Sequence, residues 1–90
     1  MPIDPDIAWR LHPQVSVRPE PFGALLYHFG TRKLSFLKDR VLVDVVGRLA
    51  TESTARDAID SAGVAPTDRA RYLRALSTLA DSHMIEARTS

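Results

Sequence analysis

Residues 23–38 read GALLYHFGTRKLSFLK, and this stretch decides how the chain folds. Two runs with a strand-like pattern, 24–29 and 33–38, flank the triplet Gly30-Thr31-Arg32. Glycine in a tight connection between two such runs is typical of a β-hairpin. The second run contains neither proline nor glycine, so its whole backbone could join a hydrogen-bond ladder. The stretch predicts a hairpin whose second strand could accept a further strand.

A short strand is predicted before the hairpin. Residues 14–18 alternate with a period of two and end at Pro19-Glu20-Pro21, which forms a stiff turn. Pro13 and Pro19 protect the outer edge of this strand, because proline has no N–H to donate. The middle strand would be paired on both sides, so 33–38 alone keeps a free and regular edge. The result is a three-stranded antiparallel meander.

The period of the apolar residues changes to that of a helix after Lys38. A first helix is predicted over 39–51 with Asp39 as its N-cap, and a second from the N-cap Thr54 to a stop at Gly63. The longest helix is predicted over 67–83. The sequence therefore predicts an α+β fold, a three-stranded antiparallel β-meander followed by three α-helices.

The two ends of the chain lie outside this pattern. Residues 1–13 contain three of the six prolines, so they cannot form a helix or a ladder-forming strand for long, and we expect a partly ordered arm, mobile up to about Trp9. Trp9 and Leu11 would anchor this arm to the domain. Residues 14–88 form the predicted domain, with an apolar clip at 84–85 and a frayed tail at 88–90.

Composition excludes several classes of function. Ninety residues form one small domain whose core leaves little room for a deep catalytic pocket. A formal net charge of +1 gives no general attraction to nucleic acid, and no apolar run is long enough to cross a membrane. The chain has no cysteine, which fits a reducing cytoplasm. We expect a cytoplasmic monomer rather than a dimer.

Polar motifs give no signal for catalysis or metal binding. His12, His28 and His83 lack the spacing of a metal site, and His28 is interpreted as a packed or hydrogen-bonded residue. No metal and no cofactor are expected. The arginines of the last helix are the one local basic cluster. Arg71 and Arg74 are interpreted as a solvated face, whereas Arg69 borders the apolar stripe.

A groove is predicted if the last helix lies alongside strand 33–38. One wall would offer backbone hydrogen-bonding groups and the other apolar side chains, so an extended peptide could enter as a fourth strand. Three segments then carry a resemblance: PFGALLYHFGTRKLSFLK (21–38), VLVDVVGRLA (41–50) and RYLRALSTLADSHMI (71–85). They resemble the PqqD-like family of peptide-recognition elements, in particular the peptide chaperones of the mycofactocin system. The resemblance covers residues 15–85 and is most specific at 27–32, YHFGTR.

The resemblance implies a winged-helix-like fold without catalytic residues or a cofactor. Such proteins bind the leader of a ribosomally made precursor peptide and deliver it to a radical S-adenosylmethionine (SAM) enzyme. The leader adds to the third strand and packs on the last helix. Carried onto this sequence, the peptide-binding residues are Leu34, Ser35, Phe36, Leu37 and Lys38 on the strand and Arg69, Tyr72, Leu73 and Leu76 on the helix.

Two other functions stay open. In a winged-helix DNA-binding protein, the last helix would read a DNA groove; however, it carries leucines and few polar residues that could contact bases. A structural or anti-activator interaction domain would show no preference for a leader over unrelated peptides. The sequence alone names neither the precursor nor the groove contacts.

Overall fold

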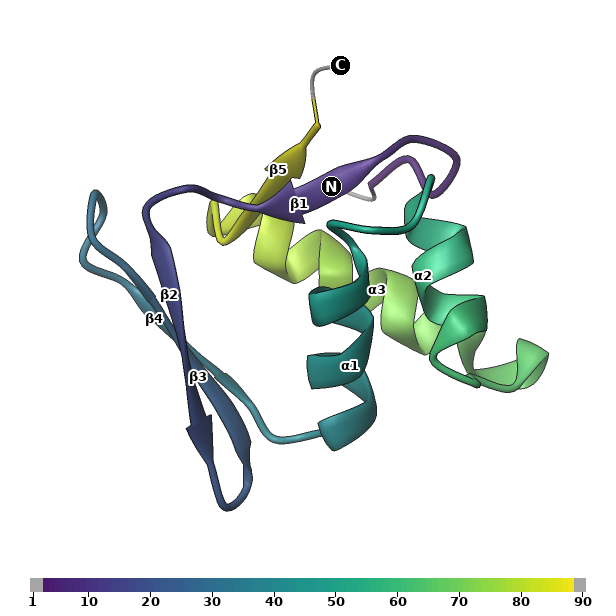
Figure 1. The fold of residues 1–90 in the computed structure, drawn as a ribbon, viewed down its shortest axis with the longest axis horizontal. Coiled ribbons are helices and arrows are strands. Elements are labelled where there is room, and N and C mark those ends of the chain that lie inside the picture. Colours follow the sequence, from purple (N-terminus) through teal and green to yellow (C-terminus); the bar gives the residue numbers. More distant parts are fainter. Residues whose placement is uncertain (1–2, 89–90) are drawn as a thin grey trace.

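The computed structural model describes residues 3–88, and two antiparallel sheets flank the helices (Figure 1). The elements are β1 (Trp9–Leu11), β2 (Val15–Glu20), β3 (Gly23–His28), β4 (Leu34–Leu37), α1 (Arg40–Arg48), α2 (Ala55–Ser61), the 3₁₀ turn η1 (Pro66–Asp68), α3 (Arg69–Asp81) and β5 (Ile85–Ala87). The predicted α+β class, a meander followed by three α-helices, is confirmed. Among these residues, no helix has the length and apolar character needed to cross a membrane.

The meander has the strand order β2-β3-β4, and its register sorts the side chains by face. Ala24 pairs with Leu37 and Leu26 with Ser35, and this face turns toward the helices. Leu25 pairs with Phe36 and Tyr27 with Leu34 on the opposite face. Leu37 is 3% exposed, whereas Leu34 and Phe36 are 52% and 58% exposed. We call these the inner and the outer face of the sheet.

The connection between β3 and β4 depends on His28 more than on Gly30. His28 is buried, and its Nδ1 accepts hydrogen bonds from the amides of Gly30 (3.0 Å) and Thr31 (3.1 Å). Arg32 takes the left-handed conformation of the turn, with φ of 63°. A Cβ at Gly30 would lie 2.9 Å from Cε1 of the buried His28 ring, so a larger residue there would disturb this turn. The interpretation of His28 as a packed, hydrogen-bonded residue is confirmed.

Helix caps follow the predicted pattern at two starts. The Asp39 carboxylate accepts from the amides of Val41 and Leu42, and the Thr54 hydroxyl accepts from the Asp57 amide. Gly63 follows α2 with φ of 82°. The last helix starts later than predicted, because η1 occupies Pro66–Asp68. Proline lacks the amide hydrogen and fits such a first turn.

The N-terminal arm contains a strand that the sequence did not predict. β1 pairs with β5, with Leu11 opposite Ile85 and Trp9 opposite Ala87. The sequence predicted that residues 1–13 could not form a long strand, and β1 has three residues; its pairing was missed, because a partner more than 70 residues away leaves no trace in a local pattern. Residues 1, 2, 89 and 90, parts of the predicted arm and frayed tail, lie outside the described residues.

The C-terminal end is also held more firmly than predicted. The amide of Arg88 donates to the carbonyl of Ala8 at 2.9 Å. Its guanidinium donates to the carbonyls of Ala50 and Glu52, in the loop after α1. The predicted frayed tail is therefore wrong for this residue. Arg88 ties β5 to the arm and to the segment between α1 and α2.

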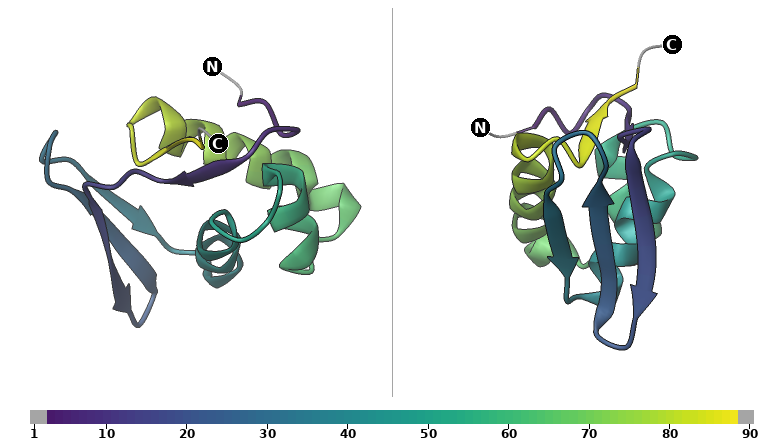
Figure 2. Two further views of the ribbon diagram at one scale, coloured as in Figure 1. Left: turned by 45° about the horizontal axis from the view of Figure 1, so that its top comes forward. Right: turned by 90° about the vertical axis from the view of Figure 1, so that its left-hand side faces the viewer.

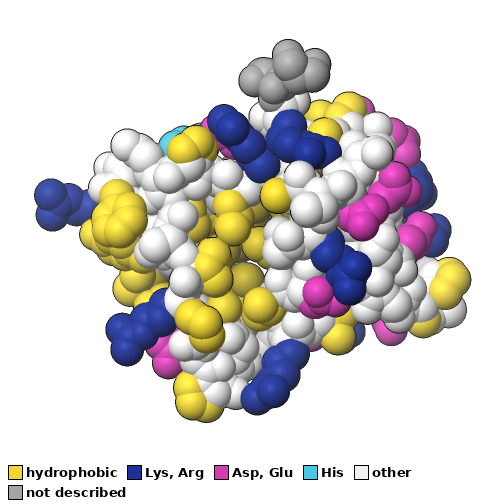
Figure 3. Space-filling model, in the orientation of Figure 1, with side chains coloured by type: hydrophobic (Ala, Val, Ile, Leu, Met, Phe, Trp, Pro, Cys, Tyr) yellow, Lys and Arg dark blue, Asp and Glu magenta, His cyan; other side chains and the backbone are white. Residues whose placement is uncertain are grey.

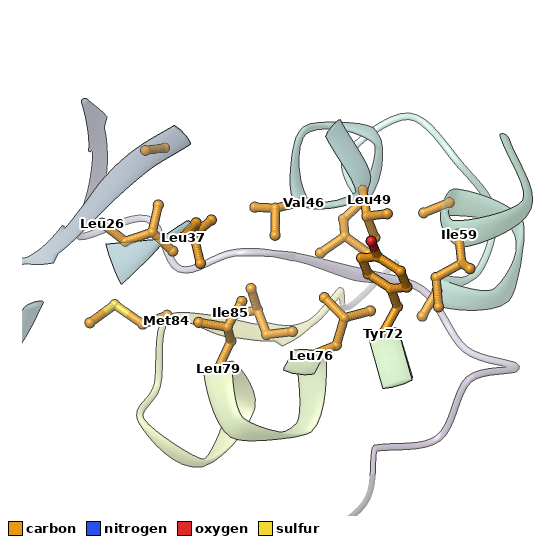
Figure 4. Close-up of a cluster of buried hydrophobic side chains, with 14 residues drawn as sticks. Leu26, Leu37, Val46, Leu49, Ile59, Tyr72, Leu76, Leu79, Met84 and Ile85 are labelled. Carbon is orange, nitrogen blue, oxygen red and sulfur yellow. The ribbon is translucent and has the colours of Figure 1, made fainter. Parts of the chain in front are cut away.

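The core lies between the inner face of the sheet and the helices (Figure 4). Leu26 and Leu37 enter it from the sheet, and Met84 and Ile85 meet them from the segment after α3. The predicted clip at 84–85 is thus a fully buried part of the core, at 0% and 2% exposure. The other buried apolar residues are Ala24, Val45, Val46, Leu49, Ala55, Ala58, Ile59, Tyr72, Leu76 and Leu79.

Deletion of residues 1–6 tests whether the arm is structural. The Pro5 carbonyl accepts from the Arg56 amide at 2.9 Å, and the Ile3 amide donates to Ser77 Oγ at 3.0 Å. We expect the free energy of unfolding, measured by urea denaturation, to fall by about 1–2 kcal/mol. Asp6→Ala keeps this backbone and removes the exposed ion pair with Arg56, so it should have a smaller effect. Unchanged stability of the deletion would show that the arm adds nothing.

Candidate functional site

The outer edge of β4 is the most regular unpaired backbone of the meander. Within residues 3–88, β4 pairs with β3 alone. The His28 amide donates to the Lys33 carbonyl at 3.0 Å, so these two residues form a hydrogen-bonded pair between β3 and β4. In an antiparallel ladder hydrogen-bonded pairs alternate with pairs that are not hydrogen-bonded. Ser35 and Leu37 therefore direct their N–H and C=O groups toward β3. Leu34 and Phe36 direct theirs toward the free edge.

The other edge of the meander is less suitable for pairing. Pro19 lies within β2 and lacks an N–H donor. Pro13 precedes β2, as the sequence suggested. The chain enters β2 from β1, as Figure 1 shows. A further strand would therefore find a continuous row of donors and acceptors at β4 and an interrupted row at β2.

α3 lies beyond the free edge of β4. Figure 2 (right) shows β4 at the left of the sheet, with α3 behind it on the side away from β3. Figure 3 views the opposite side of the molecule, where β2 is in front, and shows hydrophobic side chains between the sheet and α1. No enclosed pocket is found among the described residues, so the surface is open. An extended chain fits such a surface better than a compact small molecule does.

Asp39 connects the end of β4 to α3. Its carboxylate accepts from the Tyr72 hydroxyl at 2.6 Å and also caps α1 through the Val41 amide at 2.8 Å. Arg71 Nη2 donates to the same hydroxyl at 3.2 Å, and its guanidinium lies 5.0 Å from the centre of the Tyr72 ring. The sequence predicted Asp39 only as a helix cap and Arg71 only as a solvated arginine. Their partnership depends on residues 33 positions apart.

The hydrogen bonds shift the pKa values of both partners. The bond from Tyr72 is the main cause that lowers the pKa of Asp39 below its ordinary 3.8; the two capping amides and Arg71 add to this, and burial opposes it. The same bond is the main cause that raises the pKa of Tyr72 above its ordinary 10.0. The charged carboxylate and the neutral phenol are therefore the forms that the fold stabilises.

The two flanks of α3 face different neighbours. Tyr72 and Arg71 meet Asp39, so their flank, which continues through Ala75, Thr78 and Ser82, faces the end of β4. The opposite flank carries Arg69, Leu73 and Ser77. Nη2 of Arg69 forms an ion pair with Oδ1 of Asp60, near the end of α2, at 2.8 Å. The hydroxyl of Ser77 accepts a hydrogen bond from the Ile3 amide. This second flank therefore faces α2 and the arm.

The predicted site residues are thus only partly together. Leu34 and Phe36 are exposed on the outer face of β4, Ser35 is half-buried and Leu37 buried on the inner face, and Lys38 is exposed just after the strand. Tyr72 and Leu76 lie on the buried face of α3 and point into the core, at 5% and 0% exposure. Arg69 and Leu73 are half-buried on the flank away from β4. The sequence pattern could not separate the two flanks, because both border the same apolar stripe.

The histidines near β2 have structural roles in turns. Among residues 3–88, no group of three or more His, Asp or Glu side chains is placed to hold a metal ion. The rings of His12 and His28 lie in contact, tilted by 40° with centroids 4.5 Å apart, and the Nδ1 atom of each accepts a hydrogen bond from a backbone amide. His12 thus organises the turn before β2, and His28 organises the turn between β3 and β4.

A family model described as the peptide chaperone MftB family matches residues 8–86. The chain belongs to this family. The match runs from β1 into β5, so it includes both sheets and all three helices. The family's role as peptide chaperones is non-catalytic, which confirms the prediction that the chain is not an enzyme.

Curated relatives extend this match over most of the chain. The peptide chaperone MftB of Mycolicibacterium smegmatis is 63% identical over 82 residues, which cover 91% of this chain and 80% of that protein. That of Mycobacterium tuberculosis is 62% identical over 85 residues, covering 94% and 78%. That of Mycobacterium ulcerans is 63% identical over 82 residues, covering 91% and 75%. No solved structure gives a significant match.

Tyr72→Phe tests the bond between Asp39 and α3. We expect the free energy of unfolding at about pH 7 to fall by about 1–2 kcal/mol, because the carboxylate loses a donor. Because folding lowers the pKa of Asp39, its ionised carboxylate stabilises the folded state at pH values above the pKa that Asp39 has in the unfolded chain. This stabilisation is lost as the pH falls through the pKa that Asp39 has in the folded state. The parent should therefore lose more stability than the variant between about pH 5 and pH 2.

Urea denaturation across this range measures the effect. Tyr27→Phe is the matched control, since it removes a hydroxyl from the outer face of the sheet, away from Asp39. It should leave both the stability and its pH dependence close to those of the parent. Equal acid sensitivity of Tyr72→Phe and the parent would contradict the role of this bond.

Proposed function

We propose that this chain is a cytoplasmic chaperone that binds the leader of a ribosomally made precursor peptide, that of the mycofactocin system, and presents it to a radical SAM maturation enzyme. The observation that carries the proposal is the free edge of β4 beside α3. Membership of a peptide chaperone family supplies the class of ligand. The edge supplies a means of holding it that requires no cofactor and no reactive side chain.

Strand addition explains how one short edge can bind a peptide. The N–H and C=O groups of Leu34 and Phe36 would pair with the leader backbone, as they would with a fourth strand of the sheet. Successive leader side chains would then alternate between the two faces. One set would lie beside the aromatic outer face, and the other would point toward α3. The backbone ladder supplies affinity, and these two environments supply selectivity.

The α3 flank that carries Arg71, Ala75, Thr78 and Ser82 forms the second wall in this proposal. Ala75 and Ser82 are half-buried, and their small side chains leave room for the leader. Tyr72 and Leu76 position this wall from the core rather than by touching the peptide over a large area. Arg69 and Leu73 would act through the placement of α3 against α2 and the arm.

Presentation to the enzyme is a matter of local concentration. A chaperone that holds the leader and also contacts the enzyme turns the encounter with the distant modified segment into an intramolecular event. The effective concentration is set by the length of peptide between the two sites. The chaperone therefore needs no chemistry of its own.

The arginines of α3 favour this proposal over DNA recognition. Arg69 is paired with Asp60, and Arg71 is stacked on Tyr72. A helix that reads a DNA groove needs several free cationic and polar side chains along one exposed face. Two of these three arginines are engaged within the protein, which leaves Arg74 as the more available cation of the cluster. We propose a monomer that does not bind nucleic acid.

Phe36→Pro tests strand addition at the backbone. The Phe36 amide points to the free edge, so proline should remove a donor to the leader while keeping the ladder between β3 and β4. We expect at least a tenfold loss of leader affinity relative to Phe36→Ala, measured by calorimetric titration with the synthetic leader. Phe36→Ala is the matched control, because it removes the same aromatic ring but keeps the backbone N–H. Circular dichroism must show both variants folded, and equal affinities would contradict strand addition.

Ala75→Phe tests which flank of α3 forms the wall. A larger side chain on the flank that faces β4 should obstruct the leader, and we expect at least a tenfold loss of affinity. Leu73→Phe enlarges a side chain on the opposite flank and should leave affinity within about twofold of the parent. The same titration distinguishes the two. A stronger effect of Leu73→Phe would place the leader on the flank of Arg69 instead.

A further inference from the structure

The outer face of the meander carries an exposed apolar surface that the peptide edge does not explain. Four aromatic or aliphatic side chains stand out: Phe22, Phe29, Leu34 and Phe36, with 39%, 61%, 52% and 58% of their surface exposed. By register, Leu25 and Tyr27 lie on the same face. We call these six residues the outer-face patch.

The side chains of the outer-face patch contact one another. The rings of Phe22 and Phe36 have centroids 6.1 Å apart, and those of Tyr27 and Phe29 meet edge to face at 4.9 Å. The patch therefore crosses from the turn before β3 to the end of the hairpin. Aromatic clusters of this kind cost free energy in water and commonly mark a binding surface.

Nothing in the described part of the chain covers the patch. Figure 2 (right) views the sheet from its outer side, and β2, β3 and β4 lie in front of the helices. All three helices and the β1–β5 sheet lie on the inner side. The core is complete without the patch, because the inner residues Ala24, Leu26 and Leu37 supply the contribution of the sheet.

Positive charge is concentrated in the segment that carries the patch. Residues 14–40 contain five basic and two acidic residues, a net charge of +3 in a chain whose total is +1. The five basic side chains are all exposed: Arg18, Arg32, Lys33, Lys38 and Arg40. The two acidic residues are engaged, Glu20 with Arg18 at 3.0 Å and Asp39 with Tyr72. Figure 3 shows hydrophobic side chains along the left margin of the molecule with Lys and Arg beside them.

We propose that the outer-face patch is the docking surface for a folded protein whose own surface is apolar at the centre and rich in carboxylates at the rim. An aromatic centre with a charged rim is the usual anatomy of a protein interface, and the positive rim selects a negative one. The inference rests on the proposed function, in which this partner is the maturation enzyme. The leader occupies the β4 edge and the enzyme occupies the face, so both bind together.

Two variants away from β4 test this docking surface. Phe22→Ser removes one aromatic side chain of the patch, and Arg18→Glu reverses one charge of its rim, opposite Leu25. The full chain is titrated with the purified maturation enzyme and, separately, with the synthetic leader. Each variant should bind the enzyme at least tenfold more weakly and the leader within about twofold of the parent. Arg18→Glu should also reduce the salt dependence of enzyme binding.

Ile7→Ser is the matched control, because Ile7 and Phe22 have the same exposed fraction, 39%, and Ile7 lies in the arm. It should leave enzyme binding unchanged. Parental enzyme binding by both patch variants would overturn the docking surface while leaving the proposed function intact. A parent that binds the leader but not the enzyme would overturn both the docking surface and the presentation step, and a parent that binds neither would overturn the whole proposed function.

Two further measurements identify other occupants of the patch. Sedimentation of the parent as a dimer that Phe22→Ser converts to a monomer would assign the patch to a second copy of this chain and overturn the proposal. Binding of the parent to phosphatidylglycerol vesicles, lost in both patch variants, would assign it to a lipid surface with the same result. A monomeric parent that ignores such vesicles and binds the enzyme through the patch supports the proposal.

Discussion

The carboxylate of Asp39 fixes the geometry on which the candidate site depends. It lies one residue after Lys38, caps α1 and accepts the Tyr72 hydroxyl from α3. One side chain thus positions the end of β4, the start of α1 and the side of α3 that faces the free edge. If α3 moved away from this carboxylate, its flank would also move relative to β4. The spacing between β4 and α3 is therefore set by a charge-assisted hydrogen bond as well as by the apolar core.

The small β1–β5 sheet holds the remaining part of this framework. β5 follows α3 after a turn in which His83 is left-handed, with φ of 63°, and Met84 is fully buried. Pairing with β1 brings the arm over the core, where the carbonyls of Pro5 and Ile7 accept the first free amides of α2. Those amides would otherwise lack partners at the helix start. Residues 3–13 of the arm are thus part of the folded domain.

Local patterns predicted the meander and the helices because each is encoded over a few residues. Alternation in 24–29 and 33–38 gave the strands, and the caps at Asp39 and Thr54 gave two helix starts. The β1–β5 pairing was missed, since neither strand is more than three residues long and the two lie at opposite ends of the chain. The free edge of β4 could be predicted from the distribution of prolines. Which flank of α3 faces that edge could not, because hydrogen bonds to Asp39, Asp60 and Ile3 decide it.

An unpaired edge is usually a risk for a soluble domain, since it can pair with any exposed strand. Here the risk is contained by the shortness of β4, four residues, and by the exposed Lys33 and Lys38 at its two ends. Lysine at an edge opposes pairing with a second copy of the same strand, because like charges would then meet. A peptide with carboxylates at the matching positions would meet no such repulsion. The same two charges can therefore discourage self-association and favour a chosen peptide, which lets a small domain keep its edge open.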